Sequence, residues 1–293
     1  MNFLMKQERT VIGVDLGGTN MRAGLVKGNT IALHAQRLVP KTTDATLVVK
    51  ELIALITEML TPEVTAIGIG VPSLVGRQSG IVYDVQNIPS WKEVPLKGIL
   101  TGMFNLPVFI NNDANCFAVG ERVFGSGVEF DDFVGLITGT GMGGGIIKNG
   151  HLMQDQNCGA GEFGMIPYLD HDYEYYCSGQ FFTNQYGVAG DVLAAQAEAG
   201  DPTAIEAFNE YGRHLGNGIK TILLAIDPEA IIIGGSVAQS FHLYKNSLWD
   251  EINRFPYRIT LKNIRILPSQ MAEIAIFGAA ALCIDNTVNR TEL

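Results

Sequence analysis

Residues 10–28 read TVIGVDLGGTNMRAGLVKG, an apolar run, a glycine-rich turn and a second apolar run. Two aliphatic runs separated by a short turn rich in Gly and Asn predict a β-hairpin. A second turn at Gly28–Asn29 leads into TIALHAQRLV (30–39), which predicts a third strand. The chain is therefore expected to open on an antiparallel meander.

Helix and strand signals alternate through the rest of the first half. Residues 44–60 (DATLVVKELIALITEML) carry apolar side chains at helical spacing, with Asp44 as the expected N-cap. Residues 64–72 (VTAIGIGVP) and 106–113 (LPVFINND) read as buried strands, and a helix is expected from Ala114 onward. This order favours a sheet flanked by helices.

The second half begins as the first does. Residues 130–152 predict a strand, a glycine-rich turn and another strand, and residues 201–227 predict a long helix with Pro202 at its first position. Another strand is expected within residues 228–238, and the apolar segment 274–284 closes the pattern.

The repeat concerns structure rather than residues, and it suggests two similar halves. We predict an α/β protein with mixed sheets, in two domains that face a cleft. The first domain is expected to comprise residues 1–117 and 280–293, and the second residues 118–279.

Composition narrows the class of protein. The 293 residues are 47% hydrophobic, which predicts a sizeable packed core, and the net charge of −10 argues against nucleic acid as a partner. There is no signal-like N-terminal segment and no apolar run approaching ~18 residues, so no membrane association is expected. Four scattered cysteines without a C-x-x-C pair are typical of reduced thiols, which predicts a cytoplasmic location.

Three glycine-rich turns each follow an apolar strand, at residues 13–20 (GVDLGGTN), 139–145 (GTGMGGG) and 231–237 (IIIGGSV). Glycine lets backbone N–H groups approach an anion, and consecutive turn amides form a nest for phosphate oxygens. One such turn is more often an ordinary tight hairpin. Three of them at strand ends favour phosphate binding.

Two other phosphate motifs do not fit. There is no G-x-x-x-x-G-K-[ST] sequence, which excludes a P-loop. GTGMGG matches G-x-G-x-x-G, but a dinucleotide fingerprint must open a helix, whereas GIIKNGHL after it reads as a hairpin strand.

Two acids stand where strands end. Asp15 adjoins the first glycine turn, where it is expected to hold Mg²⁺ through water, the alternative being an Asx bond that closes its own turn. Asp113 follows the strand at 106–113, where it fits equally a base that accepts a hydroxyl proton and the N-cap of the next helix. Asn112 beside it can hydrogen-bond a polyol.

Three further residues are candidates for polyol binding. Asn87 lies in a loop with Pro and Trp, Glu162 in GAGEFG, and Glu174 in DYEYYCSG. Taken one at a time, Asn and Glu residues in loops are more often simply solvated.

Seven motifs in order resemble the ROK family of sugar kinases, within the actin/hexokinase/Hsp70 ATPase superfamily, over residues 10–284. The motifs are VDLGGTNMRAGLV, GIGVPSLVG, NIPSW, NNDANCFAVGE, TGTGMGGGII, GEFG and DPEAIIIGGSV. The resemblance implies a two-domain actin-like (ribonuclease H-like) fold, with a cleft for ATP–Mg²⁺ and a hexose that is phosphorylated on its 6-hydroxyl. It also implies a C-terminal helix that packs on the first domain, and a homodimer.

By position in these motifs, Asp113 becomes the catalytic base. The sugar contacts implied by the family are Asn87, Asn112, Asp113, Glu162 and Glu174. The implied ATP contacts are Gly17, Gly18 and Thr19 in the first phosphate loop, Gly139, Thr140 and Gly141 in the second, and Gly234 and Gly235 in the adenosine loop.

The chain departs from the family at its zinc site. Met165 stands where the family has a His that both contacts sugar and binds zinc, and the Cys-rich knuckle that follows in the family is missing. We therefore predict no zinc, and expect Tyr168, Tyr173, Tyr175 and Tyr176 to hold this segment by packing. The lost His also removes one hydrogen bond to the sugar.

The leading function is thus an ATP:hexose 6-phosphotransferase, with glucose first and fructose, mannose, N-acetylmannosamine or N-acetylglucosamine as alternatives. A non-catalytic sugar or nucleotide sensor is the second reading, which the retained Asp113 disfavours. A structural ATPase is the third. Repressors of the family carry a helix-turn-helix before the first phosphate loop, and the nine residues before Thr10 are too few for one.

Overall fold

The computed structural model describes residues 9–76, 78–85, 87–154 and 156–291. The chain divides into two compact units. Unit 1 comprises Met1–Val128, His151–Ala160 and Met271–Leu293, and unit 2 comprises Glu129–Gly150 and Gly161–Gln270. The division drawn from the sequence differs from this one, because it assigned residues 118–128, 151–160 and 271–279 to the second domain.

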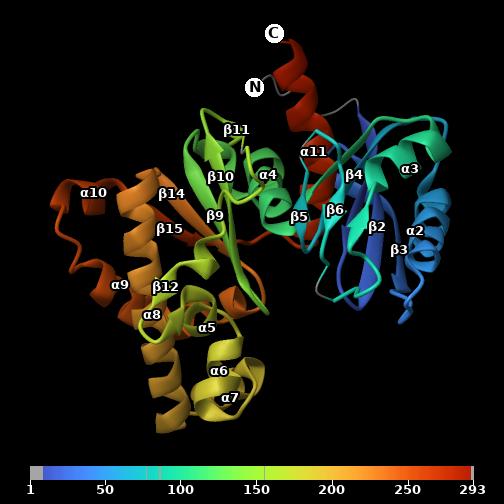
Figure 1. The fold of residues 1–293 in the computed structure, drawn as a ribbon. Helices are drawn as coiled ribbons and strands as arrows, with labels where there is room; N and C mark the ends of the chain where they lie inside the picture. The colour runs from blue at the N-terminus through green and yellow to red at the C-terminus, as the bar shows by residue number, and fades with distance from the viewer. Residues whose placement is uncertain (1–8, 77, 86, 155, 292–293) are drawn as a thin grey trace. The chain divides into compact units, whose positions relative to one another are not determined.

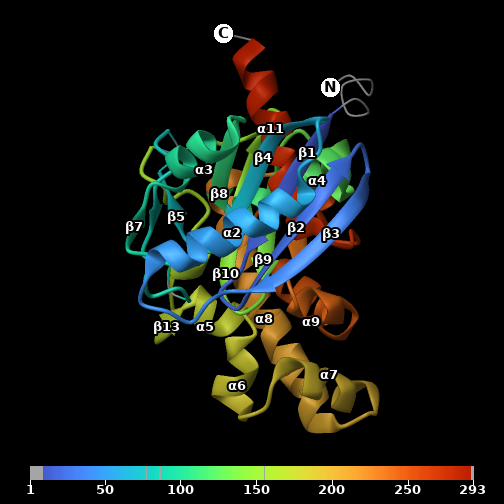
Figure 2. The ribbon, with the colours of Figure 1, turned by 90° about the vertical axis from the view of Figure 1, so that its right-hand side faces the viewer.

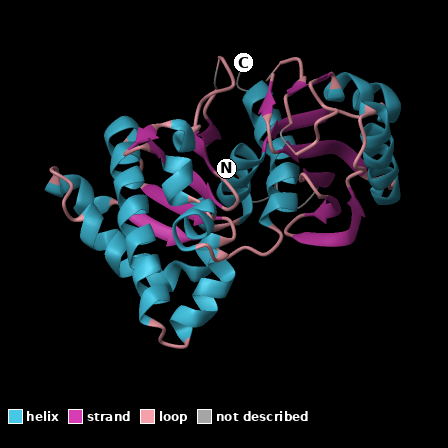
Figure 3. Cartoon of the chain, turned by 60° about the horizontal axis from the view of Figure 1, so that its bottom comes forward, coloured by secondary structure: helices cyan, strands magenta, loops and turns pink. Residues whose placement is uncertain are grey.

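Unit 1 is built on a five-stranded mixed sheet, and Figure 3 shows helices on both of its faces. The strand order is β3-β2-β1-β4-β8. β1 to β3 form the predicted antiparallel meander, and β4 and β8 continue the sheet parallel to β1. The strands are β1 (Thr10–Leu16), β2 (Asn20–Lys27), β3 (Thr30–Leu38), β4 (Val64–Val71) and β8 (Val108–Asn112).

Helices cover both faces of this sheet, as Figure 1 shows. α2 (Ala45–Met59) and α3 (Leu96–Phe104) share one apolar core with the strands, and in Figure 2 α2 lies in front of the sheet. α4 (Asp113–Phe124) and α11 (Ile274–Thr291) pack on the opposite face. The Asp44 carboxylate accepts a hydrogen bond of 2.8 Å from the Thr46 amide, which confirms the predicted cap of α2.

α11 approaches the sheet very closely at glycine positions. A Cβ atom on Gly68 of β4 would lie 1.9 Å from the Ala279 carbonyl oxygen, and one on Gly13 of β1 would lie 2.2 Å from the Ile276 carbonyl oxygen. The helix backbone therefore rests directly on the strands. This confirms the expected return of the C-terminal helix to the first half of the chain.

The remaining elements of unit 1 are short. A small sheet in the order β5-β6-β7 follows β4. The bounds are β5 (Leu74–Val75), β6 (Val82–Tyr83), β7 (Glu93–Val94), η1 (Ser126–Glu129) and β11 (His151–Leu152).

Unit 2 contains the second predicted hairpin, β9 (Phe133–Thr138) with β10 (Met142–Lys148). β14 (Ala230–Gly234) pairs in parallel with β9, and β15 (Arg265–Pro268) pairs in parallel with β14. Both units therefore combine a hairpin with parallel strands, and the predicted α/β class is confirmed.

The long predicted helix is α8 (Pro202–Ile226), with Pro202 at its start and Asp201 as its N-cap. It packs along α9 (Phe241–Ile252), and both contribute to the apolar core of unit 2. The other elements are η2 (Phe163–Met165), β12 (Pro167–Tyr168), β13 (His171–Asp172), α5 (Tyr173–Cys177), α6 (Gln180–Tyr186), α7 (Gly190–Glu198), η3 (Val237–Ser240) and α10 (Arg258–Asn263).

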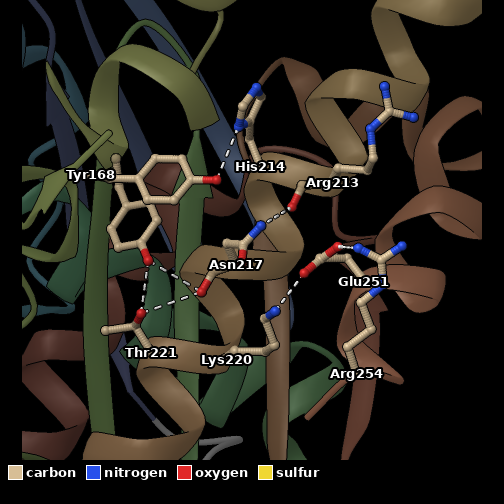
Figure 4. Close-up of polar contacts among 9 residues, drawn as sticks. Tyr168, Arg213, His214, Asn217, Lys220, Thr221, Glu251 and Arg254 are labelled. Atoms are coloured by element: carbon tan, nitrogen blue, oxygen red, sulfur yellow. Dashed lines mark hydrogen bonds and ion pairs between the residues drawn. The ribbon is translucent and has the colours of Figure 1, made fainter. Parts of the chain in front are cut away.

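Aromatic packing holds the segment that lacks the zinc knuckle. Tyr168 stacks on Tyr173 with ring centroids 4.5 Å apart, and its hydroxyl lies 3.2 Å from Nδ1 of His214 on α8 (Figure 4). The Tyr173 hydroxyl lies 2.8 Å from Thr221 Oγ1, also on α8. Tyr175 and Tyr176 pack edge to face at 4.9 Å. The four tyrosines thus do make the packing contacts expected of them.

Candidate functional site

The carboxyl ends of β1, β4 and β8 lie side by side in unit 1. Asp15 pairs with Gly70, and Gly70 with Asn111. A Cβ atom on Gly70 would lie 3.9 Å from the Asp113 Cα atom. Burial, together with the charges of Asp113 and Asp15, raises the pKa of the Cys116 thiol well above its usual value. The fold therefore brings Asp15 and Asp113 to one edge of the sheet.

Asn112, and not Asp113, is the N-cap of α4. Its Oδ1 atom accepts a hydrogen bond of 2.8 Å from the Ala114 amide, and its Nδ2 atom donates one of 3.3 Å to the Ser73 carbonyl. Asp113 is already the first helical residue, with Oδ1 2.9 Å from the Ala114 amide. The reading of Asp113 as the N-cap is therefore wrong, and a role in binding or catalysis is the reading that stays open for this half-buried carboxylate.

The first glycine turn lies against Asn87. The Gly17 amide donates a hydrogen bond of 2.9 Å to the Asn20 carbonyl, which closes the turn, and the Val39 amide donates one of 2.8 Å to the Thr19 carbonyl. A Cβ atom on Gly18 would overlap the Asn87 side chain, 2.1 Å from its Cβ atom. Gly17, Gly18, Thr19 and Asn87 thus gather beside each other in unit 1.

Asp15 is paired with an arginine on the neighbouring strand. Its Oδ2 atom accepts from Arg22 at 2.7 Å (Nη2) and 3.2 Å (Nε), and Arg22 Nη1 lies 3.2 Å from Glu273 Oε2. Burial lowers the pKa of Arg22, but its bond to Asp15 and the charges of Asp15 and Glu273 outweigh this and raise it.

The side chains around Asp15 decide whether it can hold Mg²⁺. Within the described residues no group of three or more His, Cys, Asp or Glu side chains converges as a metal cage. A single carboxylate fits Mg²⁺ only if the ion keeps most of its own waters, which is how Mg²⁺ is commonly bound. Asp15 fits that mode, and Arg22 would compete with the ion for the same oxygen.

In unit 2 the second glycine turn is anchored to the start of α6. The Gly139 carbonyl accepts 2.7 Å from the Gly179 amide, and the Thr140 carbonyl accepts 2.9 Å from Gln180 Nε2. The Gly139 amide also donates 3.0 Å to the Gly141 carbonyl, across the turn. The carbonyl groups of Gly139 and Thr140 are therefore both held by the start of α6.

Glu174 lies against the same turn. Its Oε2 atom accepts 3.1 Å from the Met142 amide, and a Cβ atom on Gly141 would lie only 2.6 Å from that oxygen. Burial, and secondly the charge of Glu174, raise the pKa of Glu162. Glu162 and Glu174, two of the three acids predicted to bind sugar, are therefore neighbours.

Glu162 follows a glycine whose backbone conformation other residues rarely adopt. Gly161 has φ +89°, and its carbonyl accepts 2.8 Å from Gly144 of β10. A Cβ atom on Gly161 would lie 1.7 Å from the Gly144 carbonyl oxygen, so only glycine fits here. This contact fixes the loop that carries Glu162 onto β10.

The third glycine turn meets the second. Thr138 Oγ1 donates 3.2 Å to the Gly234 carbonyl, and a Cβ atom on Gly235, at φ +91°, would lie 2.9 Å from the Gly139 nitrogen. Beside these turns unit 2 has a cavity of about 550 Å³. Its lining includes Phe182, Asp191, Ala194, Glu198, Ser236 and Gln239.

The predicted residues thus form one group in each unit. Unit 1 holds Asp15, Gly17, Gly18, Thr19, Asn87, Asn112 and Asp113, and unit 2 holds Gly139, Thr140, Gly141, Glu162, Glu174, Gly234 and Gly235. Met165 beside Glu162 is 55% exposed. The structure brings each group together within its own unit.

Sequence reasoning missed three features of these groups: Arg22, Gln180 and the cavity. Arg22 lies directly opposite Asp15 in the hairpin register, so the tight turn could have revealed it. Gln180 contacts Thr140 from forty positions away, and no local pattern marks such a contact.

No helix in the described part of the chain is long and apolar enough to cross a membrane.

Known proteins resemble this chain over most of its length. The model of the ROK family matches residues 11–286. The glucokinase of Streptomyces coelicolor is 30% identical over 263 residues, covering 78% of this chain and 82% of the relative. The xylose repressor of Bacillus subtilis is 29% identical over 237 residues, covering 75% of this chain and 61% of the repressor.

A solved structure shows the same architecture. The ROK family glucokinase of Streptomyces griseus, in complex with glucose and AMPPNP, superposes with a TM-score of 0.78 at 28% identity. The match covers 93% of this chain and 98% of that one.

Proposed function

Because this chain belongs to the ROK family and has the two-domain actin-like ATPase fold, we propose that it is an ATP-dependent sugar kinase. The reaction transfers the γ-phosphoryl group of ATP to the 6-hydroxyl of a hexose. One observation carries the proposal: Asp113 lies at the same edge of the sheet as Asp15, which precedes a glycine turn two strands away, and Asp113 is not the N-cap of α4. Relatives named as glucokinases support it.

In this proposal Asp113 accepts the proton of the sugar hydroxyl as the bond to phosphorus forms. Asn87, Asn112, Glu162 and Glu174 contact the sugar. Asn112 can do so only with the hydrogen-bonding capacity that remains beyond its bonds to Ala114 and Ser73. Burial and the charge of Glu174 raise the pKa of Glu162, and its carboxyl oxygens can accept hydrogen bonds from sugar hydroxyls.

The glycine turns supply the ATP contacts in this proposal, through Gly17, Gly18 and Thr19 and through Gly139, Thr140 and Gly141. Gly234 and Gly235 lead into the cavity of unit 2, which is large enough for a nucleoside. Asp15 would hold Mg²⁺ through water, and the ion would neutralise triphosphate charge. It stays a prediction that the protein binds no zinc, forms a homodimer and is located in the cytoplasm.

Glucose is the first substrate we propose, with fructose, mannose, N-acetylmannosamine and N-acetylglucosamine as alternatives. A second candidate function is a sugar or nucleotide sensor without turnover, which the similarity to a xylose repressor favours. A sensor has no need of a base, and the placement of Asp113 therefore favours the kinase.

Coupled ADP release with a hexose panel separates these functions. We expect sugar-dependent turnover, and an Asp113→Asn variant should lose about 10²–10⁴-fold in kcat while still binding sugar. Asp84→Asn is the matched control, because Asp84 is 77% exposed and lies outside the sheet edge. Binding without turnover would favour the sensor, and turnover independent of sugar would favour a plain ATPase.

A further inference from the structure

The second glycine turn owes its orientation to residues outside it. The carbonyls of Gly139 and Thr140 are held by Gly179 and Gln180, at 2.7 Å and 2.9 Å. Both donors belong to the junction between α5 and α6, in the same unit. The turn is therefore fixed through its carbonyl oxygens.

Fixing a carbonyl also fixes the next amide. In a trans peptide the N–H of the following residue points opposite to the C=O, because the peptide unit is planar. None of the peptide bonds in the described residues is cis. The bond from Gln180 to Thr140 therefore directs the Gly141 N–H away from α6, and the bond from Gly179 does the same for the Thr140 N–H.

Consecutive N–H groups directed to one side are what a phosphate nest requires. We propose that Gln180 is a positioning residue for the triphosphate: by holding the Thr140 carbonyl it aims the Gly141 amide at a phosphate oxygen. This inference rests on the proposed function, since it concerns the nucleotide of that reaction. No motif assigns Gln180 a role.

Glu174 gives the same turn its second support. Gln180 Nε2 lies 3.5 Å from Glu174 Oε1, while Glu174 Oε2 accepts from the Met142 amide at 3.1 Å. Gln180 thus stands between a turn carbonyl and an acid that bonds the residue just after the turn. The absence of a side chain on Gly141 is needed for this approach as well as for phosphate, since its Cβ atom would lie 2.6 Å from the Glu174 oxygen.

The proposal depends on the hydrogen-bond donor of the side chain at position 180. Gln180→Met keeps the length of the side chain and removes the donor, whereas Gln180→Lys keeps a donor. Gln185→Met is the matched control, because Gln185 is on the same helix and donates only to the Tyr175 hydroxyl, at 3.3 Å, in the bonds described. One net hydrogen bond corresponds to a change of roughly 2- to 13-fold in affinity.

Binding of AMPPNP and of adenosine, measured by titration calorimetry and competition, tests the proposal. We expect Gln180→Met to weaken AMPPNP binding by about 3- to 10-fold, with Gln180→Lys restoring it. Adenosine, which has no phosphate, should bind all variants equally, and Tm should not change. A loss of helix packing would instead affect adenosine and Tm as well, and would overturn the proposal.

The outcomes distinguish this inference from the proposed function. If the wild-type protein binds no nucleotide and phosphorylates no hexose, the proposed function fails. If the wild-type protein is an active kinase and Gln180→Met binds AMPPNP as the wild type does, only the role of Gln180 is refuted.

Discussion

The contact between α11 and β4 makes a strong prediction about stability. In Gly68→Ala the new Cβ atom would lie 1.9 Å from the Ala279 carbonyl oxygen and 2.7 Å from its carbonyl carbon. Ordinary contact begins at 3.4 Å, so the helix must move by about 1.5 Å. Both atoms belong to backbone, and no side-chain rotation relieves the clash.

The cost follows from what such a shift disrupts. Ile276, Phe277 and Ala280 of α11 are buried against Val11 and Ala66 of the sheet. Overpacking typically costs about 1–3 kcal/mol, and a backbone clash belongs at the upper end. Replacing Gly by Ala in a strand also stabilises the folded state by about 0.5–1 kcal/mol, because the unfolded chain loses conformational freedom. We therefore expect a net loss of about 2 kcal/mol in the free energy of unfolding of unit 1.

Thermal and urea unfolding, followed by circular dichroism, measure this loss. A loss of about 2 kcal/mol should lower Tm by about 4–8 °C. Gly98→Ala is the matched control, because nothing lies within 4 Å of its Cβ position in α3. It should raise stability by about 0.5–1 kcal/mol. If Gly68→Ala were as stable as the wild type, the close packing of α11 on β4 would be refuted.

Three more variants test other contacts. Burial lowers the pKa of His214 below its usual 6.5, so its contribution to stability is present above that pH and is lost as pH falls. His214→Gln should therefore reduce the fall in the free energy of unfolding between pH 7.5 and pH 5, measured by urea unfolding. If the variant lost as much stability over this range as the wild type does, the burial of neutral His214 would be refuted. Arg22→Gln should lower the Mg²⁺ concentration needed for half-maximal turnover by up to about fivefold, because the pair with Asp15 is partly exposed, while Arg213→Gln, which breaks the pair with Glu206, should not. Gly161→Ala should raise KM for sugar at least tenfold, because its Cβ atom would lie 1.7 Å from the Gly144 oxygen and displace Glu162. A KM equal to that of the wild type would show that Glu162 does not bind the sugar.

Local rules predicted the elements well where backbone chemistry decides them. The turn residues between β1 and β2, the cap at Asp44 and the proline at the start of α8 act within a few residues, so the sequence alone indicates them. The cap of α4 could not be predicted in this way, because Asn112 and Asp113 are both good capping residues. It is decided by the extended ψ of 149° at Asn112, after which Asp113 is already helical.

Contacts between distant segments were beyond those rules. The bond from Gln180 to Thr140 and the proximity of Glu162 and Glu174 depend on how α5 and α6 pack in unit 2. The division of the chain at Val128 depends on α4 packing with α11, whose sequences lie far apart. The family motifs named most site residues, but not the partners that orient them.

The placement of α11 has a consequence for biosynthesis. Unit 2 is complete once residue 270 has been made, whereas the sheet of unit 1 still lacks the helix that covers Gly13 and Gly68. On the ribosome, the strands that carry Gly13 and Gly68 therefore wait, with part of one apolar face uncovered, for α11, which begins only at Ile274. Chaperones that shield such surfaces should bind the nascent chain up to that point and release it afterwards.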